Sequence, residues 1–222
     1  AKDRIIDAAR MYAKTDKAMI IYSLGMTEHS TGTATVMSLA NLATVTGHLG
    51  RPNVGINPTR GQNNVQGSCD MGALPNVHVG YQKLDDKKVK AKLEKAWGVE
   101  LDEKTGLTCT EMDIAMNKGK LKAYYIFGED PAMTNANVNF VKSGLKKLDF
   151  LVVQDIVPTE TSEFADVILP GSSHAEKDGT FTNGERRIQL VRKAIEPLGG
   201  KADWEIICMV AKALGIKNMN YS

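Results

Sequence analysis

Cysteine is scarce in this sequence of 222 residues and follows no ligand-binding pattern. The three cysteines, Cys69, Cys109 and Cys208, lie far apart, and no two of them have the Cys-x-x-Cys spacing of a zinc or cluster site. An odd number of thiols also cannot pair completely within one chain. We therefore expect reduced thiols in a cytosolic protein, and neither a disulfide scaffold nor a self-contained iron–sulfur cluster.

An excess of charge of one sign is also missing, as are long apolar runs. The 28 lysines and arginines and the 26 aspartates and glutamates leave a net charge of +2, which gives no support for binding to nucleic acid or to a membrane surface. No apolar run approaches the roughly 18–20 residues of a membrane span. Residues 1–4 carry no secretion signal, and we expect a cytoplasmic location.

The common nucleotide and metal motifs are absent as well. The sequence has no GxGxxG and no GxxxxGK followed by serine or threonine, so a standard dinucleotide or phosphate loop is not indicated. The four histidines, His29, His48, His78 and His174, are scattered and form no HExxH pair. We therefore predict no metal site built from this chain's own residues.

Strand and helix patterns alternate along the chain, and 42% hydrophobic residues are ample for a core. This alternation predicts an α/β fold with a doubly wound, mostly parallel sheet built from Rossmann-like units. The Gly-, Pro- and Asn-rich residues 51–75 are predicted to form a long, ordered, functional loop. Apolar runs predict strands at residues 18–23, 121–127, 149–153 and 166–170, and helical spacing predicts helices at 2–14, 33–49, 85–97, 134–145 and 203–214, the last with Asp203 as its N-cap.

Ligands of such sheets bind beyond the carboxyl ends of the strands, which nominates four loops. Glycines in these loops let a ligand approach the backbone, and the acids Glu129, Asp130 and Asp155 can accept hydrogen bonds from ribose hydroxyls or a purine edge. The residues alone leave two interpretations open, a nucleotide-like ligand or loops that only turn the chain and cap helices. The four loops are residues 25–29, 128–131, 154–155 and 171–174.

Arg60 stands in a loop of glycine and amide side chains. A guanidinium there suits a small carboxylate, which it can grip through two parallel hydrogen bonds. An ordinary surface arginine is the alternative interpretation.

Several motifs together resemble the molybdopterin oxidoreductases. They begin with residues 47–52 (GHLGRP), 55–58 (GINP) and 60–67 (RGQNNVQG). The continuation at residues 69–75 (CDMGALP) resembles, within that superfamily, the catalytic alpha subunit of formate dehydrogenase. Further matches follow in the expected order along essentially the whole chain, at residues 128–131 (GEDP), 153–155 (VQD), 159–161 (TET), 165–170 (ADVILP), 176–183 (EKDGTFTN), 185–187 (ERR) and 203–204 (DW).

The resemblance implies two-electron oxidation of formate to carbon dioxide, or the reverse. The cofactor would be molybdenum or tungsten held by two molybdopterin guanine dinucleotides, and electrons would leave through a 4Fe–4S cluster bound by a segment absent from this chain. Arg60 would be catalytic and orient formate, Gln62 would contact a pterin, and neither Cys69 nor Cys109 would be a ligand. The other cofactor-binding residues would be Gly25, Met26 and Glu28 at one dinucleotide, and Gly128, Asp130, Thr134, Gln154, Gly171 and Asp203 at a guanosine end, with Glu129 and Asp155 beside them.

The resemblance also implies a central fragment that is inactive by itself. Residues 1–62 would end one Rossmann-like cofactor-binding domain, residues 63–174 would form a second, and residues 175–222 would return toward the iron–sulfur domain. The partners would be the remaining domains of the same subunit and an electron-transfer subunit. Three alternatives stay open: a nitrate reductase or formylmethanofuran dehydrogenase with the same cofactor, a non-catalytic scaffold of this fold as in respiratory complex I, and a standalone nucleotide-binding module.

Overall fold

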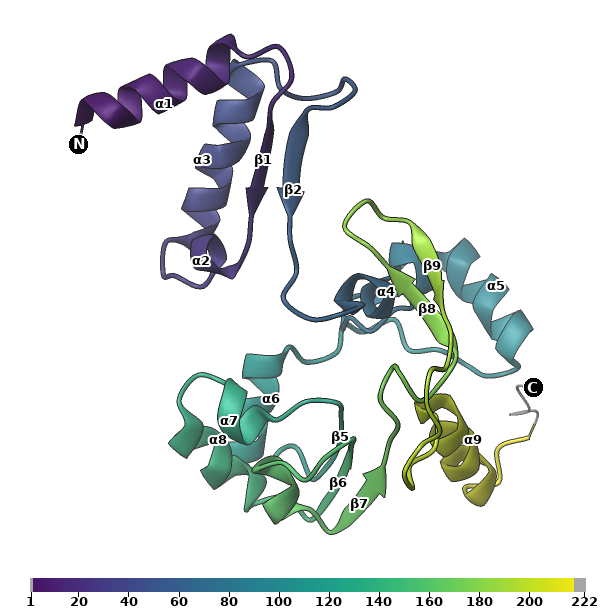
Figure 1. Ribbon diagram of the computed structural model, residues 1–222. Coiled ribbons are helices and arrows are strands. Elements are labelled where there is room, and N and C mark those ends of the chain that lie inside the picture. The colour runs from purple at the N-terminus through teal and green to yellow at the C-terminus, as the bar shows by residue number, and fades with distance from the viewer. Residues whose placement is uncertain (1, 218–222) are drawn as a thin grey trace. The chain divides into compact units, whose positions relative to one another are not determined.

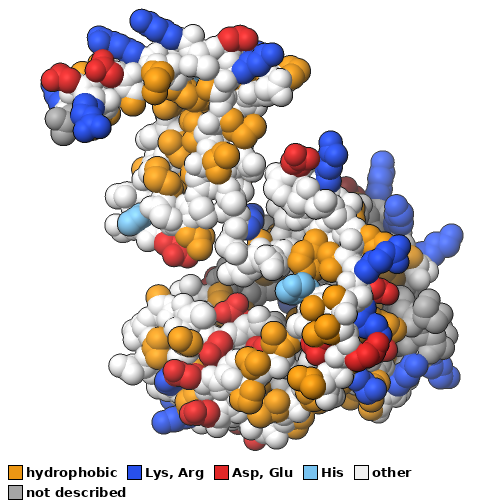
Figure 2. Space-filling view, viewed as in Figure 1, with side chains coloured by type: hydrophobic (Ala, Val, Ile, Leu, Met, Phe, Trp, Pro, Cys, Tyr) orange, Lys and Arg blue, Asp and Glu red, His pale blue; other side chains and the backbone are white. Residues whose placement is uncertain are grey.

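The computed structural model describes residues 2–217, which divide into two compact units. One unit comprises the residues up to Ser68 together with Phe181–Gln189, and the other comprises Cys69–Thr180 together with the residues from Leu190 onward. The boundaries expected at residues 62 and 174 concern domains of a longer subunit and stay a prediction. Figure 2 shows basic and acidic side chains on the visible face of both units. Within residues 2–217, no helix is both long and apolar enough to cross a membrane.

The first unit is a small parallel βαβ arrangement. Strands β1 (Met19–Tyr22) and β2 (Gly55–Pro58) pair in parallel, with Met19 opposite Gly55 and Tyr22 opposite Pro58. Helix α3 (Gly32–Val45) lies beside these strands and forms the crossover between them (Figure 1). The helices before it are α1 (Lys2–Lys14) and α2 (Leu24–Thr27).

Part of the predicted loop at residues 51–75 is regular structure. It contains strand β2 and helix α4 (Val65–Asp70), so the expectation of a loop over this whole segment is wrong. Strand β2 escapes prediction because it is four residues long and ends in proline, which cannot donate a hydrogen bond to a sheet. Its pairing with β1 supplies the stability that its own sequence lacks.

His48 is a core residue of the first unit and not a ligand candidate. Its side chain is fully buried, and Nε2 lies 2.8 Å from the carbonyl oxygen of Thr15. Because a carbonyl only accepts, Nε2 carries the proton and donates it. This bond ties the end of α3 to the turn that precedes β1.

The second unit contains a three-stranded parallel sheet in the order β5-β6-β7. Its strands are β5 (Ala123–Phe127), β6 (Phe150–Asp155) and β7 (Val167–Pro170). Helices α6 (Cys109–Asn117) and α8 (Val138–Leu145) pack together beside it (Figure 1). A cluster of buried side chains joins helices to sheet and consists of Met116, Ile126, Ala132, Val141, Leu145, Leu151 and Val153. The predicted mixed α/β fold with parallel sheets is confirmed.

Short elements complete the described chain. Helix α9 (Asp203–Ala213) begins with Asp203 as its first residue and has Ala202 as its N-cap, so the prediction of Asp203 as the cap is wrong by one position. The remaining elements are β3 (Val77–His78), the 3-10 helix η1 (Val79–Tyr81), β4 (Gln82–Lys83), α5 (Lys87–Trp97), α7 (Pro131–Thr134), the 3-10 helix η2 (Thr161–Phe164), β8 (Gly179–Thr182) and β9 (Ile188–Val191).

Candidate functional site

Three of the four nominated loops meet at one edge of the β5-β6-β7 sheet. Phe127 pairs with Gln154 and Asp155 pairs with Pro170, so the carboxyl ends of the strands lie side by side. The backbone N–H of Gly128 donates to the carbonyl of Gln154 at 2.9 Å, and that of Gly171 donates to the carbonyl of Asp155 at 2.9 Å. The sheet therefore holds these loops in fixed register at a single edge.

A chain of polar side chains crosses this edge. Gln154 is 1% exposed, and its Nε2 donates to Asp203 Oδ1 at 2.9 Å while the Tyr125 hydroxyl donates to its Oε1. On the far side of Asp203, Lys177 Nζ pairs with Oδ2 and also donates to the carbonyl of Ser172 at 2.8 Å. Burial, followed by the charge of Asp203, raises the pKa of Tyr125. The structure thus adds Tyr125 and Lys177 to the residues predicted from the sequence.

Close contacts explain the glycines at positions 171 and 200. A Cβ added to Gly171 would lie 2.8 Å from Asp203 Oδ1, and one added to Gly200 would lie 2.1 Å from the carbonyl oxygen of Gly171. Lys201 forms an isolated parallel bridge with Gly171. These contacts place the first turn of α9 directly against the end of β7.

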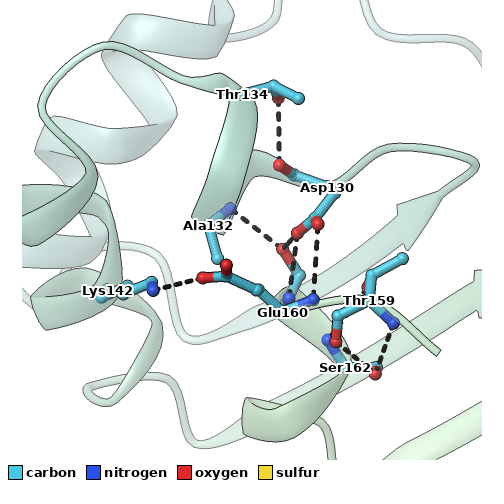
Figure 3. Close-up of polar contacts among 8 residues, drawn as sticks. Asp130, Ala132, Thr134, Lys142, Thr159, Glu160 and Ser162 are labelled. Atoms are coloured by element: carbon cyan, nitrogen blue, oxygen red, sulfur yellow. Dashed lines mark hydrogen bonds and ion pairs between the residues drawn. The ribbon is translucent and has the colours of Figure 1, made fainter.

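The side chain of Asp130 hydrogen-bonds within the protein and holds the start of η2 (Figure 3). Its Oδ1 accepts from the backbone N–H of Thr161 at 2.9 Å and from the Thr161 hydroxyl at 2.6 Å, and its Oδ2 accepts from the N–H of Glu160 at 3.3 Å. The Thr161 oxygen in turn accepts from the N–H of Ala132 at 3.0 Å. Three hydrogen bonds therefore commit most of the acceptor capacity of the Asp130 carboxylate within the protein.

Replacing Thr161 by valine should lower the free energy of unfolding by about 1–3 kcal/mol. Thr161 is fully buried, and valine would leave the N–H of Ala132 without its partner and would remove one of the two bonds that Asp130 Oδ1 accepts. Urea denaturation of the chain measures the loss. Thr161→Ser, which keeps the hydroxyl, is the matched control, and equal stability of the two variants would contradict the assigned role.

Glu129 and Asp155 retain acceptor capacity at the same edge. Glu129 Oε1 accepts from the Thr134 hydroxyl at 2.7 Å, and Asp155 Oδ1 accepts from the N–H of Ile156 at 2.6 Å. In the described chain the second oxygen of each carboxylate has no hydrogen bond. Burial is also the main cause that raises the pKa of Tyr124 to about 12. The Thr134 hydroxyl holds the carboxylate of Glu129 in place, and Glu129 is more exposed than Asp155.

Glu176 clamps the loop after β7 to the segment that precedes α9. Its Oε2 accepts from the N–H of Ser173 at 2.8 Å and its Oε1 accepts from the N–H of Leu198 at 3.2 Å. These bonds, that of the Ser173 N–H first, hold the pKa of Glu176 below its ordinary value of 4.5. The ionised carboxylate is the form that stabilises the loop.

Glu176→Gln should remove a pH-dependent part of the stability. Because the pKa of Glu176 is lowered in the folded chain, its contribution is complete above about pH 4.5 and is lost as the pH falls through the lower folded value. Urea midpoints measured from pH 7 to pH 3 should therefore differ most between wild type and variant at neutral pH and converge in acid. Glu185→Gln, at an exposed ion pair with Arg187, should stay close to wild type throughout. A constant offset for Glu176→Gln would contradict the expectation.

The fourth loop lies in the first unit, at the carboxyl ends of β1 and β2. The N–H of Thr59 donates to the carbonyl of Tyr22 at 2.8 Å, and the Ser23 hydroxyl donates to the carbonyl of Thr59 at 2.6 Å. Arg60 and Gln62 follow Thr59 closely in the sequence, and both are exposed. Helix α2 follows β1 at the same edge. Arg60 has no hydrogen bond or ion pair within residues 2–217. The predicted residues that α2 and its ends supply at this edge are Gly25, Met26 and Glu28.

The second unit's edge fits the nucleotide end of a cofactor. It combines glycine, which leaves room beside the backbone, with carboxylates, the acceptors that ribose hydroxyls and the N–H groups of a purine edge require. The Ser172 hydroxyl adds a polar atom that is buried and has no partner within the described residues. Buried polar groups normally have partners, so this atom is a further candidate contact.

Comparisons with known proteins show which proteins this chain is similar to. The chain is 50% identical over 215 residues to the F420-dependent formate dehydrogenase subunit alpha of Methanocaldococcus jannaschii, a match that covers 96% of the chain and 32% of that protein. It is 46% identical over 213 residues to formate dehydrogenase H of Escherichia coli, covering 95% of the chain and 30% of that protein. The chain thus spans about a third of the length of these relatives.

The fold is also found in a solved structure, acetylene hydratase from Pelobacter acetylenicus. The TM-score is 0.68 at 18% identity, and the match covers 99% of the chain and 33% of that structure. The family described as molybdopterin oxidoreductase matches residues 6–213, nearly the whole sequence, and implies a molybdopterin cofactor. The chain belongs to the molybdopterin oxidoreductase family.

Proposed function

We propose that the chain is the central portion of a formate dehydrogenase catalytic subunit. There it binds molybdopterin guanine dinucleotide for the two-electron oxidation of formate to carbon dioxide, or the reverse. The observation that carries the proposal is the 50% and 46% identity, along almost the whole chain, to two formate dehydrogenase subunits. Because the chain spans about a third of those subunits, we expect no formate turnover by the isolated chain.

In this proposal Arg60 is the residue that handles the substrate. Its planar guanidinium presents a fork of N–H donors that matches the two oxygens of formate. It is exposed and uncommitted at the carboxyl end of β2, in the part of the chain that the structure describes. Gln62 would donate from its amide to a pterin, while Gly25, Met26 and Glu28 would line one dinucleotide.

The edge of the β5-β6-β7 sheet would hold a guanosine end. Gly128 would admit the ligand to the backbone, Gly171 would make room for the Asp203 side chain, and Asp203, Asp155 and Glu129 would accept the N–H and O–H groups of the ligand. The other three predicted residues would mainly hold the binding edge in place, because their polar atoms already bond within the protein; they are Asp130, Thr134 and Gln154. The division separates residues that would touch the ligand from residues that shape its binding edge.

When bound, the molybdenum or tungsten of the cofactor accepts the two electrons, and a 4Fe–4S cluster held outside this chain would pass them on. We predict no metal ligand within this chain. In residues 2–217 no group of three or more histidine, cysteine, aspartate or glutamate side chains is placed to hold a metal ion. The remaining domains of the subunit and an electron-transfer subunit would be the partners, in the cytoplasm.

Metal and pterin analysis of the complete subunit, combined with a formate oxidation assay, tests the proposal. We expect molybdenum or tungsten, two pterins per subunit, and reduction of an artificial dye by formate. Bound cofactor with turnover of nitrate or formylmethanofuran instead of formate would assign the chain to a related enzyme. A subunit with neither metal nor pterin would overturn the enzyme proposal in favour of a scaffold like that of complex I.

A further inference from the structure

We propose that Lys177 is a positioning residue of the candidate guanosine end and acts through Asp203. The inference rests on the proposed function, because it concerns how the same edge of the sheet holds its ligand. Lys177 Nζ pairs with Asp203 Oδ2, and the side chains of both residues are 25% exposed. The same ammonium donates to the carbonyl of Ser172 at 2.8 Å. The Lys177 ammonium is therefore held by the carbonyl of Ser172, in the loop after β7, and faces one oxygen of Asp203.

The Asp203 carboxylate is held from both sides. Oδ1 accepts from Gln154 Nε2 at 2.9 Å, and Gln154 is itself held by the Tyr125 hydroxyl. An ionised carboxylate has about four lone-pair sites, so one bond at each oxygen leaves acceptor capacity at both. Lys177 and Gln154 together fix the plane of this group, and the remaining lone pairs are available to a ligand.

The first turn of α9 has contacts other than the one with Lys177. Lys201, just before the helix, forms a parallel β-bridge with Gly171. Within the turn itself, Glu205 accepts from the N–H of Ala202 at 3.0 Å. The backbone of Gly200 also packs directly against that of Gly171. With the helix start secured by these contacts, loss of the Lys177 ammonium should free the carboxylate to rotate and leave its charge unbalanced, while the fold stays in place.

The test uses the complete subunit loaded with cofactor and follows the rate of pterin loss by the fluorescence of oxidised pterin. Lys177→Met should lose pterin about ten to a hundred times faster than wild type, the effect of one charge-assisted hydrogen bond. Lys177→Arg should restore most of the retention. Lys193→Met, at a lysine that pairs with Glu196 in an exposed position, should match wild type. The melting temperature of the cofactor-free subunit should not differ between Lys177→Met and wild type.

A double-mutant cycle separates positioning from a general structural role. In an Asp203→Asn background, Lys177→Met should add little to the rate of pterin loss, because both changes act on the same carboxylate. Additive effects, or a Lys177→Met subunit that loses its stability along with its pterin, would overturn the assignment. Tyr125→Phe, a milder change at the other end of the same chain of bonds, should speed pterin loss several-fold.

Failure of this inference is distinguishable from failure of the proposed function. A wild-type subunit that holds pterin, together with Lys177→Met and Tyr125→Phe subunits that hold it equally well, would overturn the role of Lys177 alone. A wild-type subunit without pterin would overturn the proposed function and this inference with it.

Discussion

Replacing Arg60 by lysine in the complete subunit is expected to lower the rate of formate oxidation about a hundredfold or more, with metal and pterin content unchanged. Arginine can bind both oxygens of a carboxylate through two parallel bonds, whereas lysine offers a single flexible point of charge. Because Arg60 is exposed and makes no hydrogen bond or ion pair with residues 2–217, its replacement should cost the fold little. Steady-state kinetics with formate, alongside metal and pterin analysis, measure the effect.

The control for this experiment is an arginine that plays no part in the proposed site. Arg10 lies exposed on α1 beside Asp7, and Arg10→Lys should leave the kinetics at the wild-type level. Unchanged formate kinetics in Arg60→Lys would remove Arg60 from its catalytic role. Loss of the metal or the pterin would instead move Arg60 from substrate orientation to cofactor binding.

Gly200→Ala should have the largest effect on the second unit, a loss of about 3 kcal/mol in the free energy of unfolding. The added methyl would lie 2.1 Å from the carbonyl oxygen and 2.7 Å from the carbonyl carbon of Gly171. Backbone atoms cannot rotate aside as a flexible side chain can. The segment before α9 must therefore move away from the end of β7, and Asp203 should move with it.

The neighbouring glycine provides a matched control. A Cβ at Gly199 would meet nothing within 4 Å, so Gly199→Ala should stay within about 0.5 kcal/mol of wild type. Urea denaturation of both variants measures the difference. In the complete subunit, Gly200→Ala should also hold less pterin. Equal stability of the two variants would show that the contact between residues 171 and 200 relaxes freely.

Much of the fold could be predicted because its strands carry strong local signals. The strands β5, β6 and β7 are apolar runs that end in glycine, acid or proline. The helix predicted at residues 134–145 is present as α8, but it begins only at Val138, because Asn137 is left-handed and caps it. Helix α6 was not predicted, although Thr108 and Glu111 have the spacing of a capping box, and Glu111 does accept from the N–H of Thr108 at 2.8 Å. Strand β2 could not be predicted, because only its partner β1 makes it a strand.

The loops that form the candidate site could be predicted from the sequence, but the hydrogen-bond partners of their side chains could not. The rule that ligands bind at the carboxyl ends of parallel strands selects Gly128, Asp155 and Gly171, which the sheet does bring to one edge. The bond between Gln154 and Asp203 joins residues 49 apart in the chain, and no local pattern predicts such a pair. Family resemblance named Gln154 and Asp203 without their connection, and the family itself is confirmed by the match over residues 6–213.

The crossing of the chain between its two units has a consequence for synthesis on the ribosome. The polypeptide leaves the second unit after Thr180, contributes Phe181–Gln189 to the first, and returns at Leu190. Neither unit is therefore complete when its first long segment has emerged, and the carboxylate of Asp203 reaches Gln154 only after the intervening 48 residues have been made. The candidate binding edge of the sheet therefore cannot close on the ribosome until residue 203 has emerged, which is after Phe181–Gln189 has been made for the first unit.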